Sequence, residues 1–327
     1  MTLDENNITI KFNTTLKNCN VMFAELYNIR KIYFKKFDFS GTHMIGMFTK
    51  CKNLTELDLI NFNISSATTI DYMFYLCFWL VSLDLSNLNT SSFTSMSNLI
   101  NGCINLISVN LKNIDTSSVT NMEYMFNSCY KLKSLDLINF NTSIATTIAY
   151  MFNRCFELIS LDLSNFDTLS ITRMLYSFKE LRTLTSLDLS NFNTSSVRTM
   201  FRMFTNSTNL ITLNLSSFDT SSVTSMVSMF EGCNNLISLD LRNFDTSSAM
   251  SMISIFKNCN NLIFLDLRYF DTSSVTKINY LDAIFDGLDS NFVYCINNNT
   301  SNNLISKLKS YNYTNNCSDV CFYEYKK

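Results

Sequence analysis

The sequence of 327 residues contains no proline and only five glycines. These two residue types mark most tight turns in folds built from many short strands, so an all-β fold punctuated by Gly/Pro turns is not expected. The turns of this chain should instead rest on Asn, Asp, Ser and Thr, whose side chains bend and cap the backbone.

Groups for catalysis or cofactor binding are equally scarce. His43 is the only histidine, and no serine or cysteine can be matched to it as a nucleophile with a third orienting group. Five scattered glycines leave no phosphate loop, and C-x-x-C zinc spacing is absent. A formal net charge of -2 gives no footprint for nucleic acid. We therefore predict a protein that is not an enzyme and has no cofactor, no metal site and no nucleic-acid partner.

Long apolar runs are missing as well. The most apolar segment, residues 72–83, is far shorter than the roughly 20 residues that cross a bilayer, so no membrane span is expected. The N-terminus, MTLDENNITIKF, lacks the features of a signal peptide. On this evidence alone the chain is either cytoplasmic or a piece of a longer protein.

A 26-residue repeat is the dominant feature of the sequence. The motif L-x-L recurs at a constant spacing, beginning at Leu57, Leu83, Val109, Leu135, Leu161, Leu187, Leu213, Leu239 and Leu265. A diverged copy precedes these, so regular repetition covers residues 22–281. Self-similarity at such a period predicts a solenoid of about ten coils. We expect residues 1–21 to form an N-terminal cap and residues 282–327 a C-terminal cap or linker.

Each coil shows two hydrophobic periods. Residues 213–216 alternate between apolar and polar, which predicts a half-buried strand. Residues 223–233 carry apolar side chains at three- and four-residue steps, which predicts a short helix, and Asp219 to Ser222 supply oxygens for its N-cap. The expected class is therefore α/β, with parallel strands on one face of the solenoid and short helices on the other.

The repeat resembles that of a known family. The consensus M-F-x-x-C-x-x-L-x-x-L-D-L-S-N-F-D-T-S-S-V-T-x-M, as in residues 229–252, is similar to the repeat of the BspA-like leucine-rich-repeat surface proteins of bacteria and some parasitic protists. The resemblance covers about four fifths of the chain. It implies a protein at the cell surface, or secreted, that adheres to host or matrix proteins. Because phenylalanine fills the usual asparagine position of the leucine-rich repeat, a phenylalanine spine is expected in place of the buried asparagine ladder.

Three sets of residues are expected to form the core. They are Leu83, Leu135, Leu161, Leu187 and Leu239 of the strands, Phe166, Phe192 and Phe218 of the spine, and Cys77, Cys103, Cys129, Cys155 and Cys233. Leu181 and Ser207 interrupt the cysteine series, which favours buried free thiols over disulfides. Cys295, Cys317 and Cys321 lie outside the repeats, where disulfides and free thiols are equally compatible with the sequence.

The outward residues of the strands form a polar stripe. Its members are Asp84, Asp136, Asp162, Asp188, Asp240 and Asp266, with Ser82, Ser160, Ser186 and Ser238 beside them. Like charges one strand apart repel unless they are hydrogen-bonded or share a cation. Three interpretations remain open: carboxylates hydrogen-bonded to the flanking serines, a cation-binding stripe, and a face that binds a protein partner. The predicted function is protein binding as a surface adhesin, with an intracellular interaction scaffold as the alternative.

Overall fold

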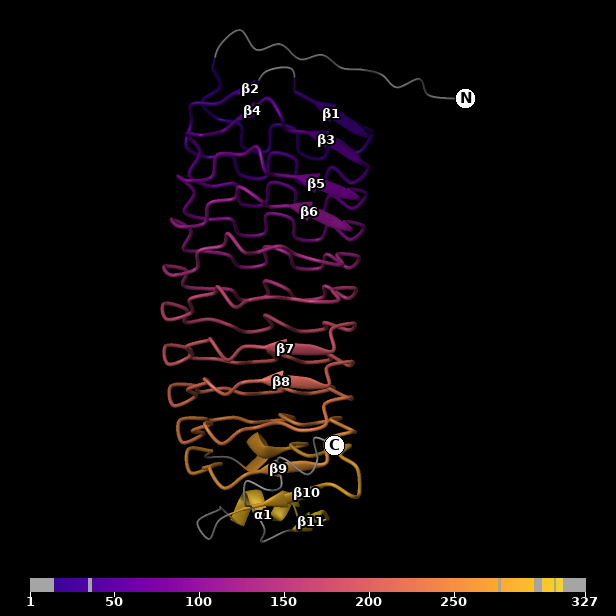
Figure 1. Cartoon of the computed structure of the whole chain (residues 1–327), viewed down its shortest axis with the longest axis vertical. Coiled ribbons are helices and arrows are strands. Elements are labelled where there is room, and N and C mark those ends of the chain that lie inside the picture. Colours follow the sequence, from indigo (N-terminus) through magenta and orange to yellow (C-terminus); the bar gives the residue numbers. More distant parts are fainter. Residues whose placement is uncertain (1–14, 35–36, 276–277, 297–301, 309, 314–327) are drawn as a thin grey trace, which may run out of the picture.

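The computed structural model describes residues 15–34, 37–275, 278–296, 302–308 and 310–313. Within these residues the chain winds into a β-solenoid of about ten coils stacked along the long axis of the molecule (Figure 1). One coil takes 26 residues, since Ser82 pairs with Ser108 and Leu187 with Leu213. The predicted coil number, period and parallel strands are confirmed.

Short strands occupy one layer of the solenoid, and all their pairings are parallel. Four sheets have two strands each: β1 (Lys31–Tyr33) with β3 (Glu56–Asp58), β2 (Phe37–Asp38) with β4 (Phe62–Asn63), β5 (Ser82–Asp84) with β6 (Ser108–Asn110), and β7 (Ser186–Asp188) with β8 (Thr212–Asn214). In a fifth sheet β10 (Val293–Cys295) pairs with both β9 (Phe264–Asp266) and β11 (Asn312–Tyr313). We call the L-x-L segments, such as residues 80–88, the strand layer.

The predicted helices are wrong. The M-F-x-x-C segments, such as residues 68–79, are runs of tight turns, which we call the turn layer. In the described residues the helical elements are η1 (Ile278–Leu281) and α1 (Asn302–Leu308), both at the C-terminal end of the stack. The expected α/β class is therefore corrected to a β-solenoid with almost no helix.

Backbone hydrogen bonds in the turn layer alternate between two kinds of partner. The N–H groups of Tyr72, Phe74 and Leu76 donate to carbonyls of the next coil at 2.8–3.0 Å. The residues between them, Met73, Tyr75 and Cys77, donate to the carbonyl three positions back. A helix would direct every N–H to the carbonyl four residues back. Half of the turn-layer bonds therefore join neighbouring coils, as they do in a sheet.

This pattern requires left-handed backbone conformations twice per coil. Tyr124 and Ser128 have φ of 58° and 57°, and equivalent residues in the other coils have similar values. Glycine fills such positions at Gly102 and Gly232, but most are held by other residue types. A non-glycine residue there costs about 1–3 kcal/mol unless the surroundings compensate. The bonds between coils supply that compensation, so few glycines do not exclude a turn-rich β fold.

The corner between the layers does not cap a helix. The Asp219 carboxylate accepts the N–H of Ser221 at 3.0 Å, which forms a local turn. In the regular coils the threonine that follows this Asp or Asn points into the core. Thr194, for example, is buried and bonds to Asp219 of the next coil: its hydroxyl donates to the Asp219 carbonyl at 2.7 Å and accepts the Asp219 N–H at 2.9 Å. The threonine of the predicted cap quartet thus links one coil to the next.

Phenylalanine columns fill the core between the layers. In the strand layer Phe166 stacks on Phe192 at 6.4 Å between ring centroids. A second column, in the turn layer, is closer: Phe152 lies 5.8 Å from both Phe126 and Phe178. Asparagines also form a ladder, because Asn165 and Asn191 donate to backbone carbonyls of the preceding coil at 2.9–3.3 Å. The phenylalanine spine therefore accompanies an asparagine ladder.

The stack changes spacing at its C-terminal end. The N–H of Met252 donates to the carbonyl of Tyr280, 28 residues on, where the regular coils use an offset of 25. β10 and β11 nevertheless continue the parallel ladder beyond residue 281. The boundaries proposed at 21/22 and 281/282 stay predictions, and residues 1–14 and 314–327 lie outside the described residues.

Candidate functional site

The outward strand-layer residues form a column of carboxylates and amides, which we call the aspartate column. Its members are Asp58, Asp84, Asn110, Asp136, Asp162, Asp188, Asn214, Asp240 and Asp266. In every member the side-chain Oδ1 accepts the backbone N–H two residues further on, at 2.9–3.2 Å. This local turn ends each strand, so each Asp or Asn first has a structural role.

The hydrogen-bond partners of the column differ from those expected. The serine two positions before each aspartate, such as Ser82, was expected to bind the carboxylate. The residue two positions after it does so instead: Ser86 donates to Asp84 through both its N–H, at 2.9 Å, and its hydroxyl, at 2.6 Å. Ser82, Ser160 and Ser186 are exposed, and Ser238 is half-buried. Their hydroxyls lie beside the column on the same face.

The carboxylates of the central column are stabilised in their charged form. Hydrogen bonds from the Ser164 backbone and hydroxyl lower the pKa of Asp162. The corresponding bonds from Ser190 lower the pKa of Asp188, with a smaller contribution from Asn214. Burial raises the pKa of Asp84, but its bonds to Ser86 outweigh this and the net pKa is lowered. These groups therefore carry full negative charge at neutral pH.

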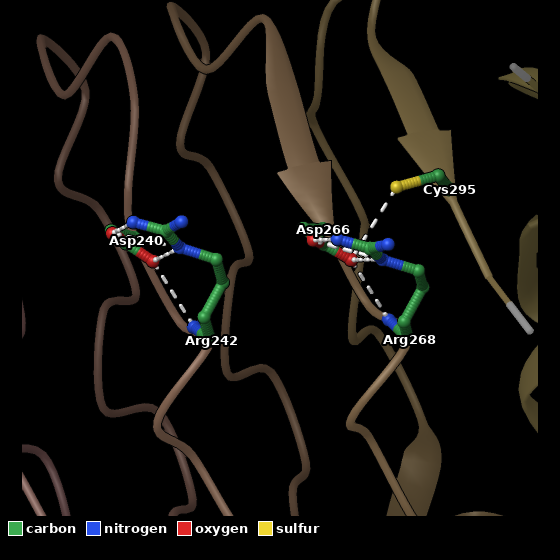
Figure 2. Close-up of polar contacts among 5 residues, drawn as sticks. All are labelled: Asp240, Arg242, Asp266, Arg268 and Cys295. Carbon is green, nitrogen blue, oxygen red and sulfur yellow. Dashed lines mark hydrogen bonds and ion pairs between the residues drawn. The ribbon is translucent and has the colours of Figure 1, made fainter. Parts of the chain in front are cut away.

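The C-terminal members of the column are neutralised within their own coil (Figure 2). Arg242 forms an ion pair with Asp240 at 2.8 Å, and Arg268 forms one with Asp266 at 2.6 Å. The two carboxylates differ in exposure, since 40% of the Asp240 side chain is accessible and 1% of Asp266. Asp266 is covered because β10 pairs with β9 and brings Cys295 within 3.4 Å of its carboxylate.

An aliphatic column borders this polar face. Val81, Ile107, Ile159, Ile211 and Ile237 directly follow a buried leucine, and each is between 39% and 64% exposed. The strand pattern read from the sequence began two residues later, so it did not include them. The signal was the break in strict alternation, which places two adjacent apolar residues on opposite sides of the chain.

The expected core positions differ in burial. Eleven of the thirteen are at most 3% exposed: Leu83, Leu187, Leu239, Phe166, Phe192, Phe218, Cys77, Cys103, Cys129, Cys155 and Cys233. Leu161 is 9% exposed, and Leu135 is partly buried against the core. The second leucine of the motif lies deeper than the first, as Leu163 at 1% shows.

The repeat cysteines are free, and their thiols are hydrogen-bonded. The Sγ atoms of Cys77, Cys103 and Cys233 donate to phenylalanine carbonyls of the preceding coil at 3.1–3.2 Å. Ser207, which interrupts the series, makes the same bond to Phe178 at 2.8 Å. Apart from Leu181, the position is therefore filled by a small hydrogen-bond donor. Outside the repeats Cys295 is disulfide-bonded, whereas Cys317 and Cys321 lie outside the described residues.

No feature of the described residues assembles catalytic chemistry. Two hollows of about 300 and 280 Å³ are shallow and open to the surface, and they are lined by residues such as Asn61 and Tyr269. His43 is exposed, with its Nδ1 2.8 Å from the Thr42 hydroxyl. Across the described part of the chain no three His, Cys, Asp or Glu side chains gather where they could hold a metal ion. Neither η1 nor α1 is long or apolar enough to cross a bilayer.

Comparison with known proteins gives a family match and a fold likeness. The family described as "Mycoplasma protein of unknown function, DUF285" matches residues 3–105, 77–186 and 172–292. A leucine-rich cell surface protein from Faecalibacterium prausnitzii is 18% identical, with 90% of this chain and 78% of that chain covered and a TM-score of 0.48. A leucine-rich repeat protein from Bacteroides ovatus is 16% identical, with 91% and 79% covered and a TM-score of 0.41. No curated protein sequence matches the chain significantly.

Proposed function

The chain belongs to the DUF285 family, whose function is described as unknown. We propose that it is a non-enzymatic protein-binding module displayed at the cell surface. We assign partner binding to the strand face, meaning the exposed part of the aspartate column with its flanking serines and the aliphatic column. One observation carries the proposal: a continuous exposed face on which charged, hydroxyl and aliphatic side chains repeat in step with the coils.

The composition of the strand face suits recognition of a protein. Charged Asp136, Asp162 and Asp188 supply long-range attraction for a basic partner. Ile159 and Ile211, at 64% and 41% exposure, supply apolar area that a partner would remove from water. The hydrogen bonds within each coil fix these groups before binding, so little side-chain entropy is lost on association.

Two features support a location outside the cytoplasm. The repeat consensus resembles that of BspA-like surface proteins, and the disulfide of Cys295 is a bond that persists in oxidising compartments. The alternative, an intracellular scaffold, is favoured by the eight free cysteines of the described residues. Because these thiols are buried, an oxidising environment would not pair them, and they do not oppose a surface location.

The strand face can be tested with substitutions that the repeat already contains. Asn110 and Asn214 occupy the aspartate column, and Thr185 occupies the aliphatic column. A variant with Asp136→Asn, Asp162→Asn and Ile159→Thr should therefore fold normally. We expect proximity labelling on intact cells to identify a partner, and this variant to bind the purified partner at least about tenfold more weakly than wild type.

A matched control alters the turn layer at exposed Thr120 and Thr146, each replaced by serine. This control should bind the partner as wild type does. Equal affinity of wild type and the strand-face variant would refute the assignment of the face. Location is tested separately by antibody labelling of intact and permeabilised cells, and labelling that requires permeabilisation would favour the scaffold alternative.

A further inference from the structure

The turn layer of the central coils carries a large excess of positive charge. Its segments between residues 120 and 211, meaning 120–131, 146–157, 172–183 and 198–209, contain seven cations and three carboxylates. The cations are Lys131, Arg154, Arg173, Lys179, Arg182, Arg198 and Arg202. The chain as a whole has a net charge of -2, so the positive excess of these segments is balanced by negative charge elsewhere in the molecule.

Two of the three carboxylates of this region lie beneath cations, and the third, Glu157, is half-buried. Only 8% of the Glu180 side chain is exposed, and it contacts Arg182 at 2.7 Å, Lys179 at 2.9 Å and Arg154 at 3.4 Å. The guanidinium groups that hold it are far more accessible, at 52% for Arg182 and 45% for Arg154. Glu123, at 18%, is covered in the same way by Arg173, at 54%. Solvent and any partner therefore meet mainly the cations.

Aromatic rings share this surface, but their faces are occupied. Tyr150 stacks between Tyr124 and Tyr176 at 4.3 and 4.4 Å between centroids. Phe156 is sandwiched between Tyr130 at 4.6 Å and the Arg182 guanidinium at 4.0 Å. Bases of single-stranded nucleic acid need an open ring face, which these columns do not offer. The strongly exposed apolar side chains of the described coils lie outside these turn segments, and Ile159 and Ile211 belong to the aliphatic column. Insertion of this surface into lipid is therefore not favoured either.

The strand layer of the same coils has the opposite charge. Residues 132–140, 158–166 and 184–192 contain three carboxylates, Asp136, Asp162 and Asp188, and one cation, Lys133. Both layers direct their apolar side chains into one core, so their outward side chains face away from each other. The central coils therefore present a cationic face on one side and an anionic face on the other.

The turn layer loses its positive excess toward the C-terminal end of the stack. In the C-terminal coils the turn segments 224–237 and 250–263 have one charged residue each, Glu231 and Lys257. There the strand-layer aspartates are neutralised by arginines of their own coil, as Figure 2 shows for residues 240 and 266. The central coils thus differ from the C-terminal coils in carrying opposite net charges on their two faces. Opposite charges on faces that point apart within one chain can attract each other between chains.

We propose that the cationic turn layer of residues 120–211 docks on the anionic strand layer of a second copy of this chain, so that copies associate side by side. The proposal rests on the protein-binding role assigned to the strand face and names a partner for it. A sideways shift without rotation brings coils of equal height together, because both faces have the same spacing of about 4.8 Å per coil. Such a contact uses two different faces, does not close, and builds an open row of molecules.

The association should be weak for each pair and sensitive to salt. Exposed ion pairs contribute little individually, so affinity requires several pairs at once. At about 1 M salt the screening length falls to about 3 Å, which removes attraction between exposed charges. We expect sedimentation velocity to show species beyond dimers at low ionic strength and monomers at high ionic strength.

Two variants of the full chain test the geometry. The strand variant carries Asp136→Asn, Asp162→Asn and Asp188→Asn, as in Asn110 and Asn214. The turn variant carries Lys131→Asn, Arg198→Thr and Arg202→Ser, residues found at equivalent positions in other coils, and it leaves the cations around Glu180 in place. A control with Lys257→Asn removes a turn-layer cation outside residues 120–211. Circular dichroism and thermal melts verify that each variant folds.

Each face variant alone should self-associate about tenfold more weakly than wild type, and the control should behave as wild type. An equimolar mixture of the two variants should form one-to-one dimers that grow no further, since each supplies the face that the other lacks. A wild type that stays monomeric at low salt, or a mixture without dimers, overturns the proposal. If the strand variant still loses binding to a separate partner, the proposed function stands while this inference fails.

Discussion

The strand layer and the turn layer are two parts of the same 26-residue repeat, yet only the strand layer has the secondary structure that its hydrophobic spacing predicts. Strand-layer side chains alternate, and Leu83 and Leu187 point inward between exposed neighbours. Apolar side chains of the turn layer recur at three- and four-residue steps, but the backbone there is a series of tight turns with two left-handed residues per coil and no helix. The comparison teaches that hydrophobic spacing reports which side chains face the core and leaves the backbone path open.

The largest expected effect compares core positions of the two layers. Phe152→Ala removes a fully buried ring that stacks on two others, so we expect a loss of about 3–5 kcal/mol in the free energy of unfolding. Leu161→Ala in the strand layer should cost about 2–5 kcal/mol, toward the lower end because Leu161 is 9% exposed. Urea titration measures both losses.

Ser164→Ala is the matched control for these substitutions. Its side chain faces outward in the strand layer, so the change should stay within about 0.5 kcal/mol. Comparable losses at Leu161 and Ser164 would mean that the strand register is wrong by one residue. A smaller loss at Phe152 than at Leu161 would mean that the turn layer contributes less to the core than its packing indicates.

The next effect concerns the corner that joins the layers. Thr194→Val removes a hydroxyl that bonds to both the N–H and the carbonyl of Asp219, and it leaves both partly buried backbone groups without that partner. We expect a loss of about 1–3 kcal/mol, measured by thermal or urea unfolding. Exposed Thr146, whose hydroxyl bonds to the Thr120 carbonyl at 3.1 Å, is the control, and Thr146→Val should change stability by less than about 0.5 kcal/mol. Similar losses at both positions would contradict the special role of the buried ladder.

The solenoid, its period and its parallel strands could be predicted because they follow from constant spacing and strict alternation. The helices could not be excluded in this way. Inward residues such as Ile148, Met151, Phe152 and Cys155 are spaced as on one face of a helix, and successive tight turns give the same spacing. Only the hydrogen bonds between coils separate the two structures, and these depend on neighbours 25 residues away. Local patterns carry no record of them.

The candidate site divides along the same line. Exposure of aspartates such as Asp162 followed from alternation, whereas their partners did not, because a serine two positions before and one two positions after are equally close in sequence. Strand geometry decides between them, since the chain turns only after the aspartate. The cationic face of the turn layer was also missed, because cations such as Arg154, Lys179 and Arg182 occupy different positions of the repeat and therefore form no recurring motif.

A smaller effect distinguishes turns from helix directly. Ser128 has φ of 57°, and glycine stands at the equivalent position in Gly102 and Gly232. Ser128→Gly should therefore raise the free energy of unfolding by about 0.5–1 kcal/mol, because glycine adopts this conformation without strain. In a helix the same substitution would lower stability by about 1 kcal/mol. Ser160→Gly in the strand layer should lower it, so opposite signs at the two serines support the turn layer and equal losses refute it.

The smallest effect at neutral pH is expected at the thiols that the turn layer buries. Ser207 shows that a hydroxyl can replace the thiol in its bond to the preceding coil, so Cys103→Ser should change stability at pH 7 by no more than about 1 kcal/mol.

Burial raises the pKa of Cys103 from 9.0 to about 12. Above about pH 9 the unfolded chain loses this proton while the folded chain keeps it, so stability falls as pH rises, by about 1.4 kcal/mol per pH unit for each such thiol. The difference between wild type and Cys103→Ser should therefore shift by about 1 kcal/mol in favour of the serine variant between pH 9 and pH 10, where the unfolded thiol is still partly protonated, as measured by urea titration at each pH. Parallel pH profiles for the two proteins, or rapid alkylation of Cys103 in the native state, would place this thiol in contact with solvent and contradict the packing of the turn layer.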